Sequence, residues 1–167
     1  AVADTVKENS LKAIEKLQDE VLEHEKTQEQ IKYIAYHDTL TGLPNRNLLN
    51  ELLVHSITLA ERNNKCMAVL FLDIDGFKMI NDSKGHGMGD QILQEVAERL
   101  LKTLRKSDVI ARHGGDEFIV IIEELDNCSG VELIANKIVN CFQEPFHLEN
   151  QDYFLTTSVG VAVYPAD

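Results

Sequence analysis

The sequence predicts an α+β domain, a mixed sheet flanked by helices, that follows an N-terminal linker helix. Residues 1–36 contain no proline or glycine, which favours one long helix. From residue 66 onward, the hydrophobic periodicity predicts the order strand, helix, strand, strand, helix, strand, strand. The chain has 167 residues, of which 44% are apolar, so it is long enough and apolar enough to bury a core of its own.

Charge and composition exclude several classes of function. With 28 acidic and 16 basic side chains the net charge is -12, which repels a polyanion and excludes general nucleic-acid binding. The longest apolar run, residues 67–72, is far shorter than the roughly 20 residues that cross a bilayer, and the chain opens with no secretory leader. We therefore expect a soluble, cytoplasmic fragment without membrane contact.

The cysteines Cys66, Cys128 and Cys141 are odd in number and have no C-x-x-C spacing. This pattern is typical of reduced thiols in a cytosolic protein. The sequence therefore predicts neither a disulfide nor a zinc site.

The linker helix carries a stripe of residues at alternating spacings of three and four. They are Ile14, Leu17, Val21, His24, Gln28, Ile31 and Ala35. The stripe favours a coiled coil and hence a homodimer when the protein is active, although a single helix packed on its own domain gives much the same pattern. We expect residues 1–36 to be a signalling helix and residues 37–167 to be the domain. Because the pattern is already under way at Ala1, we also expect a domain upstream, where the parent protein could be attached to a membrane.

Residues 38–46, Asp-Thr-Leu-Thr-Gly-Leu-Pro-Asn-Arg, form a polar joint between this helix and the domain. The elements predicted after it are a helix with apolar residues from Leu48 to Leu59, a buried strand at 67–72, a helix at 88–104, strands at 108–112 and 118–122 joined by a tight glycine turn, a helix from a capping box at 129–132 to about residue 142, and a hairpin of 146–149 and 153–164.

Two carboxylates follow the buried strand directly. Asp73 and Asp75 alternate with Ile74, so their side chains point to the same face. Magnesium takes one or two protein carboxylates together with phosphate oxygens, and a strand end is a rigid mount for them. Aspartate is equally common as a plain strand end or helix cap, so this pattern alone leaves both interpretations open.

Residues 77–90 are rich in groups that hydrogen-bond to bases, sugars or phosphates. They contain neither a P-loop nor the glycine spacing of a Rossmann fingerprint. Asn81 and Asp90 suit the edge of guanine, because a carboxylate accepts from its N1 and N2 hydrogens. Such residues are also typical helix caps, which is the alternative interpretation.

The third group is the turn at residues 114–118, Gly-Gly-Asp-Glu-Phe. Two glycines let backbone N–H groups approach a phosphate closely, and the two acids can add to a metal site on the neighbouring strand. A hairpin turn with solvated acids is the alternative, and taken singly the turn favours it. The co-occurrence of the three groups favours a nucleotide site.

Together these motifs resemble the GGDEF domain, the diguanylate cyclase family, over about residues 38–167. Residues 114–118 match the family signature letter for letter, residues 38–46 are similar to its entry motif, and residues 73–90 to its metal and guanine segment. The resemblance implies a palm-like fold of the nucleotidyl cyclase type with a ferredoxin-like core. It also implies an enzyme that condenses two GTP into cyclic di-GMP and two pyrophosphates, with magnesium or alternatively manganese as cofactor.

By position, the resemblance also implies roles for single residues. Asp73, the backbone carbonyl of Ile74, Asp116 and Glu117 would hold the metal ions. Asp116 would also act as base for the ribose 3'-hydroxyl, and Lys78 would offset charge developing on the phosphates. The substrate-binding residues would be Phe77, Asn81, His86, Asp90, Gly114 and Gly115, with Asn81 and Asp90 reading guanine.

Residues 105–108, Arg-Lys-Ser-Asp, resemble the family's inhibitory site. Arg105 would contact a guanine or phosphate of cyclic di-GMP and Asp108 a guanine edge, so we expect feedback inhibition by the product. A helix-end ion pair is the alternative. Family members continue past the strand that contains residues 158–161 into a helix with basic residues, so we expect 37–167 to be a C-terminally truncated domain.

Two other functions stay open from the sequence. One is a catalytically silent module that binds GTP or cyclic di-GMP and regulates an adjoining EAL phosphodiesterase domain. The other is a helix-driven dimerisation module with a vestigial domain.

Overall fold

The computed structural model describes residues 2–125 and 128–167. The chain divides into two compact units, residues 1–35 and 36–167. The predicted long helix is present as α1 (Val2–Tyr36), and Ala1 and the side chain of Ile14 lie outside the described residues. The exposed fractions of its apolar side chains are large, 59% for Leu17 and 61% for Ile31. The coiled coil stays a prediction.

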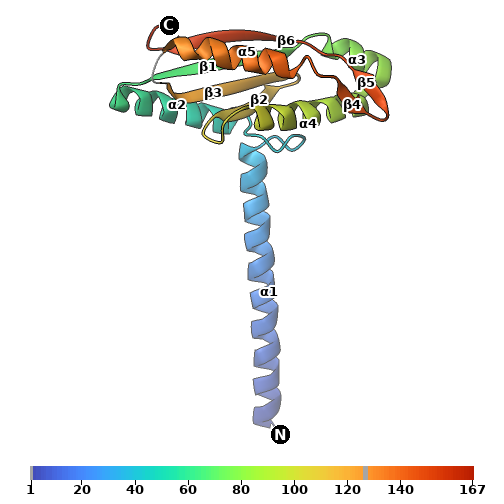
Figure 1. Ribbon diagram of the computed structural model, residues 1–167. Coiled ribbons are helices and arrows are strands. Elements are labelled where there is room, and N and C mark those ends of the chain that lie inside the picture. Colours follow the sequence, from blue (N-terminus) through green and yellow to red (C-terminus); the bar gives the residue numbers. More distant parts are fainter. Residues whose placement is uncertain (1, 126–127) are drawn as a thin grey trace. The chain divides into compact units, whose positions relative to one another are not determined.

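Helices and strands follow one another along the described residues of the second unit, and Figure 1 labels them. They are α2 (Arg46–Asn63), β1 (Cys66–Ile74), α3 (Phe77–Lys84), α4 (His86–Thr103), β2 (Val109–Gly114), β3 (Glu117–Leu125), the 3-10 turn η1 (Cys128–Gly130), α5 (Val131–Cys141), β4 (Phe146–Leu148), β5 (Gln151–Tyr153) and β6 (Thr157–Tyr164). No helix of the described residues is apolar over a length that would span a membrane.

Four strands form the main sheet in the order β2-β3-β1-β6. Each described neighbour pair is antiparallel, so β1 and β2 run in the same direction with β3 inserted between them. The sheet that the sequence predicted as mixed is thus built from antiparallel neighbours, and the α+β class is confirmed. The small hairpin of β4 and β5 forms a separate sheet.

Apolar clusters lie on both faces of the sheet, because alternate residues of β1 point to opposite faces. On one face Leu70 and Leu72 belong to the cluster that contains Ile92 of α4 and Ile138 of α5. On the other face Met67 belongs to a cluster with residues of α2. Each fully buried side chain of this size contributes about 1.5–3 kcal/mol of transfer free energy. Burial on both faces therefore fixes β1, and with it the position of the acids at its end.

An additional helix, α3, lies between β1 and α4. The sequence predicted only the helix at 88–104 after this strand. Gly76 and Gly85 flank α3 with φ angles of 74° and 84°, a conformation that glycine adopts without strain. Phe77 is 7% exposed and anchors the helix in the core. The helix has only 8 residues, too few for a clear periodic pattern in the sequence.

The C-terminal hairpin also differs from the prediction. Its turn lies at Glu149 and Asn150, whose φ angles are 49° and 61°, as two-residue hairpin turns require. The predicted strand 153–164 is broken after Tyr153, and its second part is β6, which pairs with β1 in the main sheet. Gly130 is the N-cap of α5 and makes no side-chain cap bond, in place of the predicted capping box.

The prediction of reduced thiols is wrong for two cysteines. Cys66 and Cys128 form a disulfide, with their Cα atoms 5.5 Å apart. The cause is the strand register: Cys66 lies opposite Leu125 at the end of β3, and η1 begins three residues later. A sequence separation of 62 residues gives no sign of this proximity. Cys141 is a free thiol, and burial raises its pKa.

Candidate functional site

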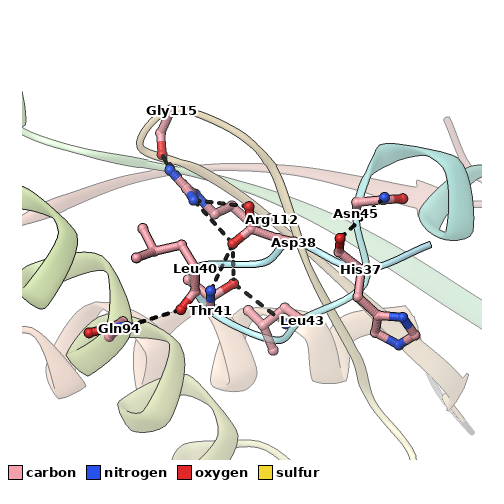
Figure 2. Close-up of polar contacts among 9 residues, drawn as sticks. All are labelled: His37, Asp38, Leu40, Thr41, Leu43, Asn45, Gln94, Arg112 and Gly115. Atoms are coloured by element: carbon pink, nitrogen blue, oxygen red, sulfur yellow. Dashed lines mark hydrogen bonds and ion pairs between the residues drawn. The ribbon is translucent and has the colours of Figure 1, made fainter. Parts of the chain in front are cut away.

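One arginine, Arg112 of β2, connects the joint at residues 38–46 to the glycine turn (Figure 2). Its Nη1 donates to the two carboxylate oxygens of Asp38 at 3.1 and 3.0 Å. Its Nε and Nη2 donate to the carbonyl oxygen of Gly115 at 3.0 and 2.7 Å. Its backbone N–H donates to the carbonyl of Pro44 at 3.0 Å. A single residue therefore holds the joint and the signature turn together.

Asp38 is fully engaged in this network. Its Oδ1 also accepts from the backbone N–H and the hydroxyl of Thr41, at 2.9 and 2.7 Å. Burial opposes ionisation of Asp38, but the hydrogen bonds from Thr41 and Arg112 outweigh it and lower the pKa. Arg112 is not among the residues predicted from the sequence. Its place two residues before Gly114 was visible, but the partners of its side chain follow from the fold.

Acids from two strands and a turn gather at the end of β1. Asp73 lies directly opposite Glu117 of β3 in the antiparallel register, so their side chains share one face of the sheet. Asp116 precedes Glu117 in the turn that joins β2 to β3. Burial and then the negative charges of Asp116, Asp75 and Glu117 raise the pKa of Asp73. The structure thus brings together the acids that were predicted as metal ligands.

The donor chemistry of these acids fits magnesium. Among the described residues, no three or more His, Cys, Asp or Glu side chains already surround a point that could hold a metal ion. Magnesium does not need such a cage, because it takes one or two carboxylates and completes its shell with waters and substrate phosphates. Burial contributes most to the raised pKa of Asp73, and a cation beside this carboxylate would relieve the repulsion by neighbouring acids that adds to it. Ile74, whose carbonyl is the other predicted ligand, is 1% exposed and fixed in the core.

The predicted base and phosphate residues lie on α3 and at the start of α4. Lys78, His86 and Asp90 are exposed. Phe77, predicted to bind substrate, is 7% exposed and belongs to the apolar core.

Asn81 of α3 has an unusual environment. Its Oδ1 is buried and has no hydrogen-bond partner. A Cβ atom at position 89 would lie 2.0 Å from this oxygen, so the Asn81 side chain occupies space that Gly89 leaves free. An unpaired buried acceptor is costly and unusual in a folded protein. The amide of Asn81 is therefore held by close contact with α4, at a site where the fold leaves its oxygen unsatisfied.

The glycine turn exposes its backbone. A Cβ added at Gly114 or Gly115 would meet no atom within 4 Å. Gly115 also has a φ angle of +52°, which favours glycine. Backbone N–H groups in such a turn are accessible to a bulky anion.

The predicted inhibitory residues lie in the tight loop between α4 and β2. The carboxylate of Asp108 accepts from the backbone N–H of Arg105 at 2.9 Å, and the Asp108 N–H donates to the Arg105 carbonyl at 3.0 Å. The Arg105 side chain is exposed. The two residues therefore form a turn, held by the Asp108 carboxylate and by a backbone hydrogen bond, in which the Arg105 guanidinium makes neither contact.

Comparison with known proteins gives the family of this fold and site. Residues 35–167 match the family described as "Diguanylate cyclase, GGDEF domain". The chain therefore belongs to the GGDEF domain family, and the resemblance found in the sequence is confirmed.

Three relatives are informative. Over 134 residues the chain is 44% identical to MucR of Pseudomonas aeruginosa, a bifunctional diguanylate cyclase/cyclic di-GMP phosphodiesterase. The matched region covers 80% of the chain and 19% of MucR. Over 137 residues the chain is 42% identical to NbdA of the same organism, a cyclic di-GMP phosphodiesterase. This matched region covers 82% of the chain and 17% of NbdA. The structure of the coiled coil and GGDEF domain of DgcB from Caulobacter crescentus, in complex with cyclic di-GMP, is similar with a TM-score of 0.79 and 29% identity, over 95% of this chain and 85% of that one.

The chain thus spans less than a fifth of the length of these two curated relatives. The predicted palm-like fold is confirmed by the similar solved structures.

Proposed function

We propose that the protein containing this chain is a cytoplasmic diguanylate cyclase, which condenses two GTP into cyclic di-GMP and two pyrophosphates. The observation that carries the proposal is the convergence of Asp73, Asp116 and Glu117 beside a glycine turn whose backbone is open. Membership of the GGDEF family supports this class of enzyme.

The residues that would hold magnesium, or manganese in its place, are Asp73, Asp116, Glu117 and the carbonyl of Ile74. When bound, the ion neutralises phosphate charge and stabilises an in-line displacement. A chain with a net charge of -12 repels GTP unless such an ion lies between them.

The residues of the chain would divide the remaining tasks. Asp116 accepts the proton of the ribose 3'-hydroxyl as its oxygen attacks the α-phosphate of the second GTP, and pyrophosphate leaves. Lys78, exposed on α3, offsets the charge on the phosphates. The open backbone at Gly114 and Gly115 accepts the triphosphate. Asn81 and Asp90 read guanine, with His86 beside the ribose or base and Phe77 supporting α3 from below.

Each domain would bind one GTP, so two copies must meet for the reaction. The exposed apolar residues of α1, among them Leu17, Val21 and Ile31, suit the pairing of two such helices. The similarity to a solved coiled coil and GGDEF domain supports this arrangement. We propose a homodimer as the active form, with cyclic di-GMP returning to Arg105 and Asp108 as a feedback inhibitor.

Turnover of GTP by the full-length protein tests this function. With magnesium, the unaltered protein should form cyclic di-GMP, and Asp116→Asn should lower kcat by at least about 100-fold, since charge stabilisation of a transition state is worth several kcal/mol. A control is Asp152→Asn, which alters an exposed acid of β5. Equal turnover by the unaltered protein and Asp116→Asn would remove Asp116 from the mechanism.

A second function is favoured by the names and lengths of the relatives. MucR and NbdA are both described as phosphodiesterases, and the matched region is a small part of each. The domain would then bind GTP or cyclic di-GMP without turnover and regulate an adjoining EAL phosphodiesterase domain. Tight GTP binding without cyclic product, together with a change in phosphodiesterase rate on adding GTP, would support this function over the first.

A further inference from the structure

Three consecutive hydroxyl side chains hold the end of β1. We call Thr156, Thr157 and Ser158 the hydroxyl clamp. The Thr156 Oγ1 and the Ser158 Oγ donate to the two carboxylate oxygens of Asp75, at 2.6 and 2.7 Å. The Thr157 Oγ1 donates to the backbone carbonyl of Asp73 at 2.8 Å. The hydroxyl clamp thus makes three hydrogen bonds to Asp73 and Asp75, which lie about 80 residues earlier in the sequence.

The strand register explains why three neighbouring hydroxyls reach the same segment. Ser158 lies opposite Asp73, and Thr157 lies opposite Ile74. Alternation therefore puts Thr156 and Ser158 on one face of the sheet, and the buried Thr157 on the other. The Asp75 N–H donates to the carbonyl of Thr156 at 3.0 Å, which continues the pairing of the two strands beyond the last residue of β1.

The Asp75 side chain is exposed, and both of its carboxylate oxygens take part in these contacts. Its position two residues after Asp73 makes it a candidate metal ligand in the sequence. In the fold, each of its oxygens accepts a hydrogen bond from a hydroxyl group. Hydrogen bonds to a charged acceptor are about twice as strong as those between neutral groups.

The hydroxyl clamp binds the chain at the point where β1 ends and the chain turns into α3. Gly76 follows Asp75 at once, with a φ angle of +74°, and leads into α3. The segment from Asp73 to Asp75 thus follows the buried part of β1 and directly precedes Gly76. The contacts of Asp75 with β6 fix its direction at this point.

We infer that Asp75 is a positioning residue of the metal site, which with Thr156 and Ser158 holds the Asp73 carboxylate and the Ile74 carbonyl in the direction that magnesium requires. The inference rests on the proposed function and gives Asp75 a role distinct from metal ligation. Partners that orient metal ligands typically contribute 10–100-fold, by order of magnitude, to metal affinity or activity.

The test compares the two ends of the same contact in the full chain. Thr156→Val with Ser158→Ala removes both hydroxyls and leaves the Asp75 carboxylate, whereas Asp75→Asn removes the charge and leaves the hydroxyls. The control is Thr58→Val, because the Thr58 hydroxyl donates to a backbone carbonyl on the exposed side of α2, at 2.9 Å. Thermal unfolding shows whether each variant folds.

Three quantities are measured for each variant. They are kcat for GTP, the magnesium concentration that gives half-maximal binding of an unhydrolysable GTP analogue, and the hydrogen-exchange rate of the Asp75 amide. The double hydroxyl variant and Asp75→Asn should each lower kcat by about tenfold or more, and each should raise the half-maximal magnesium concentration by a similar factor. Combining them should add little, because they break one contact. Exchange of the Asp75 amide should be faster in both, and the control should be unchanged.

Two results would overturn the inference. In one, Asp75→Asn weakens magnesium-dependent binding while the double hydroxyl variant leaves it unchanged, as a direct ligand would behave. In the other, neither variant alters binding or exchange. Failure of the proposed function is a separate result: the unaltered protein then binds the analogue without making product, and binding and exchange still decide the role of Asp75.

Discussion

The two sides of the glycine turn differ in how their charges are balanced. On one side, Arg112 forms a fork with Asp38 and Gly115, and each charged group has its partner within the fold. On the other side, burial and then the neighbouring carboxylates raise the pKa of Asp73. The Oδ1 of Asn81 is similarly left without a partner. From this difference we propose that the first side serves stability and that a ligand completes the second.

The largest expected effect comes from the unbalanced side. Asp73→Asn removes a predicted metal ligand and one of several repelling charges. We expect kcat to fall by at least about 100-fold, while the melting temperature without magnesium rises, because repulsion in the folded state is reduced. Steady-state kinetics and thermal unfolding measure the two effects. A variant that is less stable and equally active would contradict the comparison.

The balanced side should respond in the opposite way. Arg112→Ala leaves Asp38 without its charged partner. The site is largely buried, because the Asp38 side chain is 22% exposed and the Arg112 side chain 13%. We expect the free energy of unfolding to fall by about 1.5–3 kcal/mol, the usual range for a lost hydrogen bond to a charged group. Urea unfolding measures it. Arg112→Lys should restore only part of the loss, since lysine has no planar fork, and full restoration would count against the proposed geometry.

Gly89 sharpens the comparison at the second unsatisfied group. Gly89→Ala places a methyl group against the Asn81 amide, and overpacking of this kind costs about 1–2 kcal/mol. The displaced amide should also raise KM for GTP. The matched variant is Gly89→Ala with Asn81→Ser, which removes the contact with the amide and keeps the one with the Phe77 ring at 3.1 Å. It should regain part of the stability but not GTP affinity. If stability stayed low in the pair, the contact with Asn81 would not be the cause.

The smallest effect concerns the pH dependence of the balanced side. The folded-state pKa of Asp38 lies below its ordinary value of 3.8, so its ionised form stabilises the fold above that pH, and the stabilisation is lost as pH falls through the lowered pKa. The difference in unfolding free energy between the unaltered chain and Asp38→Asn should therefore narrow as pH is lowered from neutral to below about pH 3. Unfolding curves over this range measure it, and a constant difference would exclude this role of Asp38.

Elements with a long or strongly periodic pattern were predicted correctly. The helix predicted at 1–36, the strand at 67–72 and the helix at 88–104 correspond to α1, β1 and α4. These predictions depend on local periodicity, which can be recognised in one segment at a time. The short helix α3 and the break after Tyr153 were missed, because the choice between alternatives there is made by packing and by pairing with a distant strand.

The sequence by itself determined the chemistry of this protein: the glycine turn, the acids beside it and the segment that resembles a guanine site are contiguous motifs. Only the tertiary structure decided which of these groups are free to act. Asp38 and Asp75 carry the same side chain as Asp73, but their carboxylates are bound by Arg112 and by the hydroxyl clamp. The reason is that hydrogen bonds between distant segments depend on the register of the sheet, which no single segment encodes.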